Sequence, residues 1–187
     1  QFKFSNCNGH YGGSLDCVVM GVPEYDGIPM LAEFKTHSDK SFDKLESVGV
    51  QAAKWEHFIQ MNQYMGHYKL KHGLYLAVNK NNDELYAEVV HFDEQIFDFD
   101  ITLAQTVSHT KKPPMKINKD KNFWLCKYCD HSEICHSGAD VFPSCRTCKH
   151  VDMRDGGKWV CLLQNNLELS KEKQYTGCNS RIPLVEM

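Results

Sequence analysis

One short stretch of the chain, Met30–Thr36, has residue types and spacing that could support hydrolysis with the help of a metal ion. Within it, Glu33 and Lys35 alternate with apolar residues. Because a β-strand repeats every two residues, both polar side chains would leave the same side of a strand. Carboxylates are suitable ligands for Mg²⁺ or Mn²⁺, and a neighbouring lysine can position a water molecule or offset charge in a transition state.

Asp16 supplies a second carboxylate for this candidate site. It follows the small residues Gly13-Ser14 and precedes Val18-Val19, a β-branched pair that predicts a second strand. Pro23–Gly27 has the composition of a hairpin loop, and two strands paired through it would bring Asp16 next to Glu33. The alternative is an ion pair on the solvent side of a hairpin, because an isolated D…E-x-K pattern often occurs by chance.

A helical segment follows these strands. Phe42–Lys71 has helical spacing and predicts one or two helices with an interruption near Gly49. Gln60 and Tyr64, four residues apart, share a helix face next to an apolar stripe. Considered alone, these two residues would be a surface amide and a core aromatic.

Further elements after this segment would extend the sheet. Gly73–Val78 predicts a buried strand and Leu85–Val90 an alternating strand, joined by a turn. A helix over 93–110 would end before Pro113-Pro114, because proline cannot continue a helix.

The order of these motifs resembles that of the PD-(D/E)xK nuclease superfamily. The resemblance rests on Gly-Ser-Leu-Asp16, on the stretch Glu33–Thr36 and on the helix bearing Gln60-x-x-x-Tyr64, and it covers roughly residues 9 to 136. The pattern is most similar to the branch that contains bacteriophage lambda exonuclease, the RecB and AddB nuclease domains and the RecB-like nucleases of CRISPR adaptation. The chain departs from the family pattern at Leu15, where many members have a proline.

The resemblance implies a restriction-endonuclease-like α/β core with a central mixed sheet flanked by helices. The implied activity is metal-dependent exonucleolytic hydrolysis of DNA in phage-type recombination, repair or replication. A restriction-type endonuclease is the enzymatic alternative. A catalytically weak, metal-stapled accessory protein that binds nucleic acid is the alternative outside the enzymes.

The resemblance also implies a role for each candidate residue. The metal ion, Mg²⁺ or Mn²⁺, would be held by the side chains of Asp16 and Glu33 and by the backbone carbonyl of Phe34. Lys35 would position the attacking water. The helix pair Gln60 and Tyr64 would orient the DNA strand.

Four of the nine cysteines form two C-x-x-C pairs, a pattern typical of metal or cluster ligands in a reducing, intracellular compartment. Cys126, Cys129 and Cys135 have the spacing C-x2-C-x5-C. This spacing resembles the last three ligands of the [4Fe–4S] staple in AddB-type and CRISPR-adaptation nucleases, whose fourth cysteine lies far upstream. Zinc held by the same cysteines, with His131 or His136 as the fourth ligand, is the alternative.

The N-terminal residues bear on that missing ligand. The chain begins with Gln1, and Phe2–Phe4 predicts a strand already under way, followed by a loop that leads to Asp16. We therefore expect the natural protein to have a preceding segment. That segment would carry the fourth cysteine of an iron–sulfur cluster.

A second cysteine group lies near the C-terminus. Four thiolates, beginning with a C-x-x-C knuckle, are supplied by Cys145, Cys148, Cys161 and Cys178. Because roughly 40 residues rarely form a stable core without a metal or a cross-link, we expect a small zinc-ribbon-like module, with disulfides as the alternative. The expected domains are a nuclease core over 1–140, with its staple at 126–136, and a zinc module over 141–187.

The net charge of −3 argues against a protein that coats nucleic acid nonspecifically, so any DNA contact must come from a local patch. Lys111–Lys127 is rich in lysine and carries Phe123 and Trp124 as stacking surfaces, so it could follow a phosphate backbone; a solvated charge run is the alternative. No apolar run reaches the length of a membrane span. We expect a cytoplasmic protein of a bacterial or phage-infected cell, with DNA and a recombination or replication protein as partners and no membrane contact.

Overall fold

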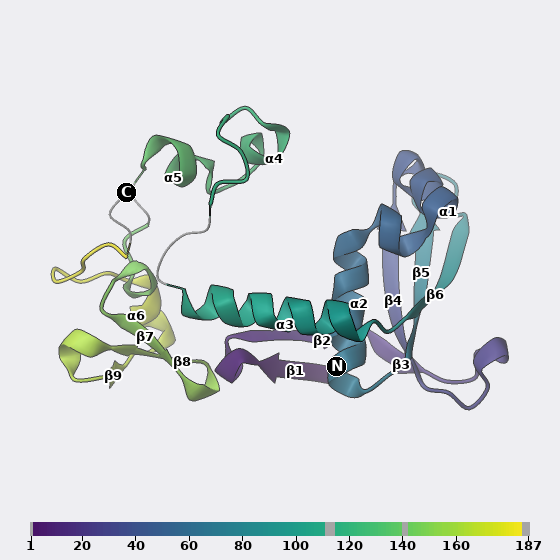
Figure 1. Ribbon diagram of the computed structural model, residues 1–187, viewed down its shortest axis with the longest axis horizontal. Helices are drawn as coiled ribbons and strands as arrows, with labels where there is room; N and C mark the ends of the chain where they lie inside the picture. The colour runs from purple at the N-terminus through teal and green to yellow at the C-terminus, as the bar shows by residue number, and fades with distance from the viewer. Residues whose placement is uncertain (1, 111–114, 140–141, 185–187) are drawn as a thin grey trace. The chain divides into compact units, whose positions relative to one another are not determined.

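The chain forms two compact units, Gln1–Thr106 and Val107–Met187, shown in the computed structural model of Figure 1. The structure describes residues 2–110, 115–139 and 142–184, so the prolines and lysines at 111–114 lie outside the described residues. The sequence predicts a domain boundary near residue 140, whereas the compact units divide after Thr106. The segment with the first cysteine group therefore belongs to the second unit.

A mixed four-stranded sheet organises the first unit, in the order β3 (Cys17–Val19), β4 (Met30–His37), β5 (His72–Asn79) and β6 (Leu85–His91). β3 pairs with β4 and β5 with β6 in antiparallel fashion, whereas β4 and β5 are parallel. The predicted α/β class, the mixed sheet and the hairpin between the first two of these strands are confirmed.

Two helices connect the parallel strands β4 and β5, because parallel neighbours need a long crossover. These helices are α1 (Asp39–Ala53) and α2 (Trp55–Tyr68). The predicted interruption is confirmed: Gly49 breaks α1 with φ 75° and ψ 173°, a backbone conformation open almost only to glycine. Beyond the break, the backbone N–H of Val50 donates to Glu88 Oε2 on β6 at 2.8 Å.

Both helices pack on one face of the sheet, as Figure 1 shows. The core they form contains buried apolar residues from all these elements, among them Leu31, Phe42, Leu45, Met61, Met65 and Tyr75. The opposite face of the sheet carries Phe34 and Leu85, which are 52% and 77% exposed. The side chains of β4 that point to the helices are therefore the ones that can form an enclosed site.

The loop predicted before Asp16 is wrong, because β1 (Phe2–Asn6) pairs with a strand β2 (Tyr11–Leu15). The glycines in β2 reflect close packing rather than a turn. A Cβ atom at Gly13 would lie 2.9 Å from the Phe4 ring and 3.1 Å from the Tyr64 ring. Glycine is needed here so that the hairpin can approach α2.

α3 (Glu94–His109) follows the sheet, close to the helix predicted over 93–110. It packs beside α2, where the His67 ring stacks on Phe4 at a centroid distance of 3.9 Å and meets the edge of Phe97 at 5.3 Å. No helix in the described ranges is long and apolar enough to cross a membrane.

His67 predicts an acid sensitivity of the first unit. Burial lowers its pKa, and its Nε2 atom is buried without a hydrogen-bond partner among the described residues. The folded state therefore favours the neutral ring, while the unfolded chain takes up a proton below its ordinary pKa of about 6.5. This part of the stability is fully present above that pH and is lost as the pH falls towards the lowered pKa of the folded state.

The free energy of unfolding of the wild-type protein should fall between about pH 7 and about pH 5, because unfolding lets His67 take up a proton. We expect this fall to be smaller in His67→Phe, by up to ~1.4 kcal/mol per pH unit. The aromatic ring keeps its place between Phe4 and Phe97, but the titrating group is gone. Chemical denaturation across this pH range measures the effect. His109→Asn, at an exposed position, is the matched control, and equal pH profiles for both variants would contradict the prediction.

Over its described residues the second unit holds a three-stranded antiparallel sheet in the order β7, β8, β9 and three short α-helices. Their bounds are α4 (Trp124–Lys127), α5 (Ser132–Ser137), β7 (Val151–Arg154), β8 (Lys158–Cys161), β9 (Leu167–Glu168) and α6 (Lys171–Tyr175). The guanidinium of Arg146 lies 5.0 Å from the Trp159 ring centroid and 4.6 Å from that of Tyr175. This cation–π arrangement ties β8 to α6.

Candidate metal-dependent active site

The structure places Asp16 next to Glu33. The register of β3 and β4 pairs Cys17 with Ala32, so the preceding residue, Asp16, lies opposite Glu33. Asp16 Oδ2 accepts a hydrogen bond from the backbone N–H of Phe34 at 3.3 Å. The two acids predicted to share a metal ion therefore lie at the same point of the sheet.

Glu33 is only 2% exposed, and burial is the largest of the effects that raise its pKa. The ammonium of Lys35 donates to Glu33 Oε1 and opposes that rise, while the charge of Asp16 adds to it. Glu33 Oε2 is buried and has no hydrogen-bond partner among the described residues. An unsatisfied buried carboxylate oxygen is costly, and a divalent cation would satisfy it.

The residues present fit a hard divalent metal ion in their chemistry. The exposed Asp16 and the buried Glu33 lie opposite each other in the strand register, and the Asp16 carboxylate is bonded to the backbone of Phe34. Over the described residues, however, no group of three or more His, Cys, Asp or Glu side chains is arranged to hold a metal ion. Backbone carbonyls and water would therefore have to complete the coordination.

Gln60 and Tyr64 come together on α2, where Gln60 Nε2 donates to the Tyr64 hydroxyl at 3.1 Å. They line a cavity of about 280 Å³, together with Gly13 of β2 and Asp100 of α3. The acids and Lys35 are not among its lining residues. The structure thus places the predicted strand-orienting pair on a hollow that the predicted metal ligands Asp16 and Glu33 do not line.

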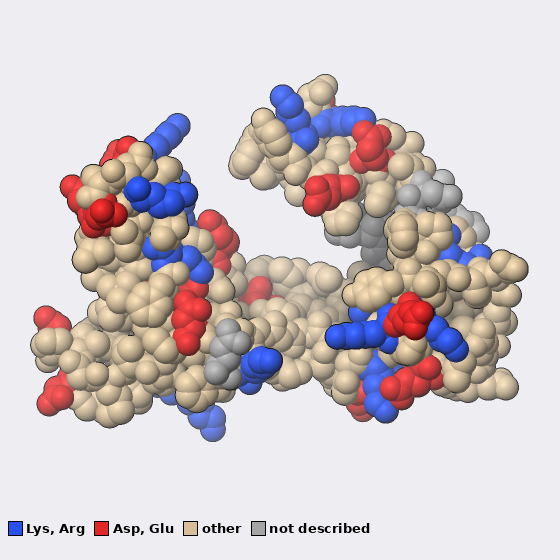
Figure 2. Space-filling view, turned by 180° about the vertical axis from the view of Figure 1, so that it is seen from behind, with Lys and Arg blue, Asp and Glu red and all other residues tan. Residues whose placement is uncertain are grey.

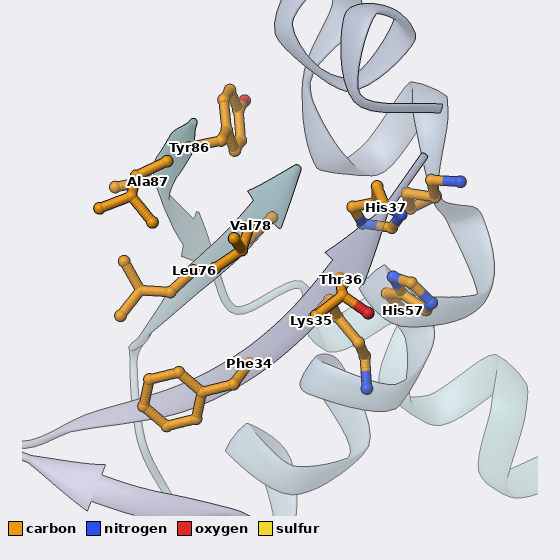
Figure 3. Close-up of a pocket in the computed structure, with 12 residues that line it drawn as sticks. Phe34, Lys35, Thr36, His37, His57, Leu76, Val78, Tyr86 and Ala87 are labelled. Atoms are coloured by element: carbon orange, nitrogen blue, oxygen red, sulfur yellow. The ribbon is translucent and has the colours of Figure 1, made fainter. Parts of the chain in front are cut away.

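A larger hollow of about 830 Å³ includes Lys35 and is partly lined by Lys54, His37 and His57. Figure 3 shows Lys35, His37 and His57 on one side of β4, with Phe34 on the other. The sequence interpretation missed both histidines. His37 continues the two-residue period of Glu33 and Lys35, and this signal could have identified it.

A backbone hydrogen bond links two of the first three cysteines. The N–H of Cys129 donates to the carbonyl oxygen of Cys126 at 3.2 Å. Cys126, on α4, is buried, whereas Cys129 and Cys135 are exposed. His131 immediately precedes α5, and His136 lies in its last turn. Both the iron–sulfur and the zinc interpretation of this segment stay predictions.

The four C-terminal cysteines converge more closely. They line one cavity of about 20 Å³, little more than the space of a single water molecule, formed by Cys145, Cys148, Cys161 and Cys178 with neighbouring residues. Burial raises the pKa of the Cys145 thiol, and the nearby Cys178, Cys148 and Cys161 raise it further. The four thiols therefore share one small cavity, although among the described residues no three of them are arranged to hold a metal ion, and the ligand set stays a prediction.

In the described part of the basic segment Trp124 is 64% exposed and Phe123 is half-buried, and Tyr128, directly after the segment, is 80% exposed. The ammonium of Lys127 lies 5.7 Å from the Tyr128 ring centroid, and Lys121 forms an ion pair with Glu133 at 2.6 Å. In Figure 2, Lys and Arg side chains are interspersed with Asp and Glu on the visible face of the second unit. Part of the positive charge in this segment is thus offset locally.

No family model and no curated protein matches the chain. A solved structure titled "Crystal structure of SSO0001" is similar over 69% of this chain, with 19% sequence identity and a TM-score of 0.42. This chain spans 52% of the length of that structure. The candidate site therefore rests on its own geometry.

Proposed function

We propose that this protein is a Mg²⁺- or Mn²⁺-dependent deoxyribonuclease of the PD-(D/E)xK type that degrades DNA from its ends. One observation carries the proposal. Asp16 and the buried Glu33 lie side by side on paired strands, Lys35 is bonded to Glu33, and Glu33 Oε2 lacks a partner among the described residues. An ion pair exposed on a hairpin would not leave a carboxylate oxygen buried and unsatisfied.

In this proposal Asp16, Glu33 and the carbonyl of Phe34 hold the metal ion, which when bound polarises the phosphate and lowers the pKa of a water molecule. Glu33 accepts a hydrogen bond from the Lys35 ammonium, which uses one of its three hydrogens. The other two hydrogens remain to hold the attacking water or the phosphate oxygen that gains charge. Gln60 and Tyr64, on the separate hollow, bind the strand away from the hydrolysed bond.

The test compares end-labelled linear DNA with covalently closed circular DNA, each with and without Mg²⁺ or Mn²⁺. We expect metal-dependent loss of the linear substrate from its ends, with the circle left intact. Cleavage of both substrates would assign a restriction-type endonuclease instead. Binding without cleavage would assign the accessory role, for which the exposed Trp124 and Tyr128 offer stacking surfaces.

A further inference from the structure

A chain of hydrogen bonds runs behind the candidate active site, from Lys54 to His57. Lys54 Nζ donates to Ser41 Oγ at 2.6 Å, and Ser41 Oγ lies 3.2 Å from His37 Nδ1. His37 Nε2 lies 2.8 Å from the hydroxyl of Tyr75. The same hydroxyl lies 2.8 Å from His57 Nδ1. Tyr75 is fully buried, and its neighbour in the sheet register is Glu33 on β4.

The chemistry of the first donor favours one direction for this chain of hydrogen bonds. Lys54 can only donate, so Ser41 accepts from it, and the Ser41 hydrogen has an acceptor within the chain when Ser41 gives it to His37 Nδ1. In the reverse direction the Ser41 oxygen would accept hydrogens from both Lys54 and His37. The Ser41 hydroxyl hydrogen would then have no acceptor among these two residues.

The direction determines which nitrogen of each neutral imidazole carries the hydrogen. With Nδ1 as an acceptor, neutral His37 carries its hydrogen on Nε2 and donates it to the Tyr75 oxygen. The Tyr75 hydroxyl then donates to His57 Nδ1. His57 therefore carries its hydrogen on Nε2, the atom that is left for an external partner. Burial lowers the pKa of both histidines, which favours these neutral forms.

The hollow of about 830 Å³ next to His37 and His57 has a polar end, and apolar side chains such as Phe34, Leu76 and Leu85 line the rest of it. The polar end holds His57, Lys35 and Lys54, and Figure 3 shows His57 near Lys35. Lys35 is close enough for its charge to lower the pKa of His57, while the charge of Glu56 acts in the opposite direction. Donors of this kind next to an acidic metal site match the oxygens of a phosphate group.

We propose that the polar end of this hollow is a phosphate subsite in which His57 Nε2–H and Lys35 bind a backbone phosphate of the DNA strand. His37 and Tyr75 are positioning residues that hold His57 with its donor directed to the ligand. The proposal rests on the proposed function, because DNA is the substrate that would bring a phosphate to this place. It adds to that function a residue outside the motif, His57.

The binding test measures the affinity of the full chain for a short fluorescently labelled single-stranded DNA in Ca²⁺, so that hydrolysis is not required. His57→Gln can place an amide N–H where His57 Nε2–H stands, whereas His57→Asn is too short and reaches only the Nδ1 position. We expect His57→Asn to weaken binding roughly tenfold or more, and His57→Gln to recover most of the affinity. Wild-type affinity in both variants, or an equal loss in both, would overturn the donor role.

A second measurement tests the positioning residues without any ligand. In ¹⁵N NMR spectra of the histidine rings we expect the hydrogen of His57 on Nε2, and we expect Tyr75→Phe to abolish that preference. A purely structural role of Tyr75 would leave the tautomer unchanged. A hydrogen on Nδ1 of His57 in the wild-type protein would overturn the proposed direction.

These outcomes are separable from a failure of the proposed function. A wild-type protein that binds DNA, is weakened by His57→Asn and does not cleave in Mg²⁺ or Mn²⁺ retains the subsite but is not a nuclease. A wild-type protein that cleaves DNA, with His57→Asn binding as tightly as wild type, is a nuclease without this subsite. A wild-type protein that does not bind DNA overturns both.

Discussion

Glu33→Gln is expected to abolish metal-dependent cleavage of end-labelled DNA, with a loss of at least ~10²-fold in rate, because an amide is a poor ligand for a hard divalent cation. The fold should remain intact or become more stable. Burial and the charge of Asp16 both disfavour the ionised form of Glu33, and glutamine has the same size without the charge. Cleavage assays and chemical denaturation, performed without metal, measure the two effects separately.

Glu24→Gln, at an exposed position between β3 and β4, is the matched control and should cleave DNA normally. Lys35→Met should also lose cleavage, but at a cost in stability, since it leaves the Glu33 carboxylate buried without its ammonium partner. Combining Lys35→Met with Glu33→Gln should restore stability but not cleavage. Full activity of Glu33→Gln would remove the nuclease assignment from these residues.

Reduced protein should carry one zinc ion at the four converging C-terminal thiols, and removal of that ion should unfold the β7–β9 sheet. The residues after 143 form only a small core, and structural zinc contributes ~10 kcal/mol or more to the folding of such modules. Elemental analysis gives the zinc content, and limited proteolysis with and without a chelator reports the unfolding. Cys148→Ser, at a buried position, should lose the ion and become protease-sensitive.

Cys129→Ser is the control, because it alters the first cysteine group and leaves the four thiols in place. In a reduced sample, absence of zinc from the unsubstituted protein would refute the zinc module. Two zinc ions, one of them lost in Cys129→Ser, would identify the first group as a second zinc staple. Iron with a visible absorption band that disappears in Cys129→Ser would identify it as an iron–sulfur cluster.

Local sequence signals predicted the elements that carry the candidate acids. The alternation in Met30–Thr36 and the β-branched pair after Asp16 predicted two strands, and both are present because period-two patterns reflect burial of one strand face. Gly49 marked the helix break correctly, because its conformation is nearly closed to other residues. In β2 the same reasoning failed, since Gly13 is required by the approach of Tyr64 rather than by a turn.

The remaining features depend on contacts between residues distant in the chain. The link from His37 through Tyr75 to His57 joins β4, β5 and α2, and it exists only because the two strands run parallel with Glu33 opposite Tyr75. A single sequence contains no local signal for that register. The placement of Gln60 and Tyr64 on a separate hollow is likewise a result of helix packing, which motif spacing does not encode.

The bond from Val50 to Glu88 couples two elements that otherwise would open independently. β6 lies at the edge of the sheet and, as an edge strand, is expected to detach first. Its Glu88 carboxylate, however, also accepts the hydroxyl of Tyr86 and holds the backbone just after the break in α1. Detachment of β6 therefore releases the last turn of α1, residues 50–53, as well, so the strand and this helix segment behave as one cooperative unit whose amide hydrogens exchange together.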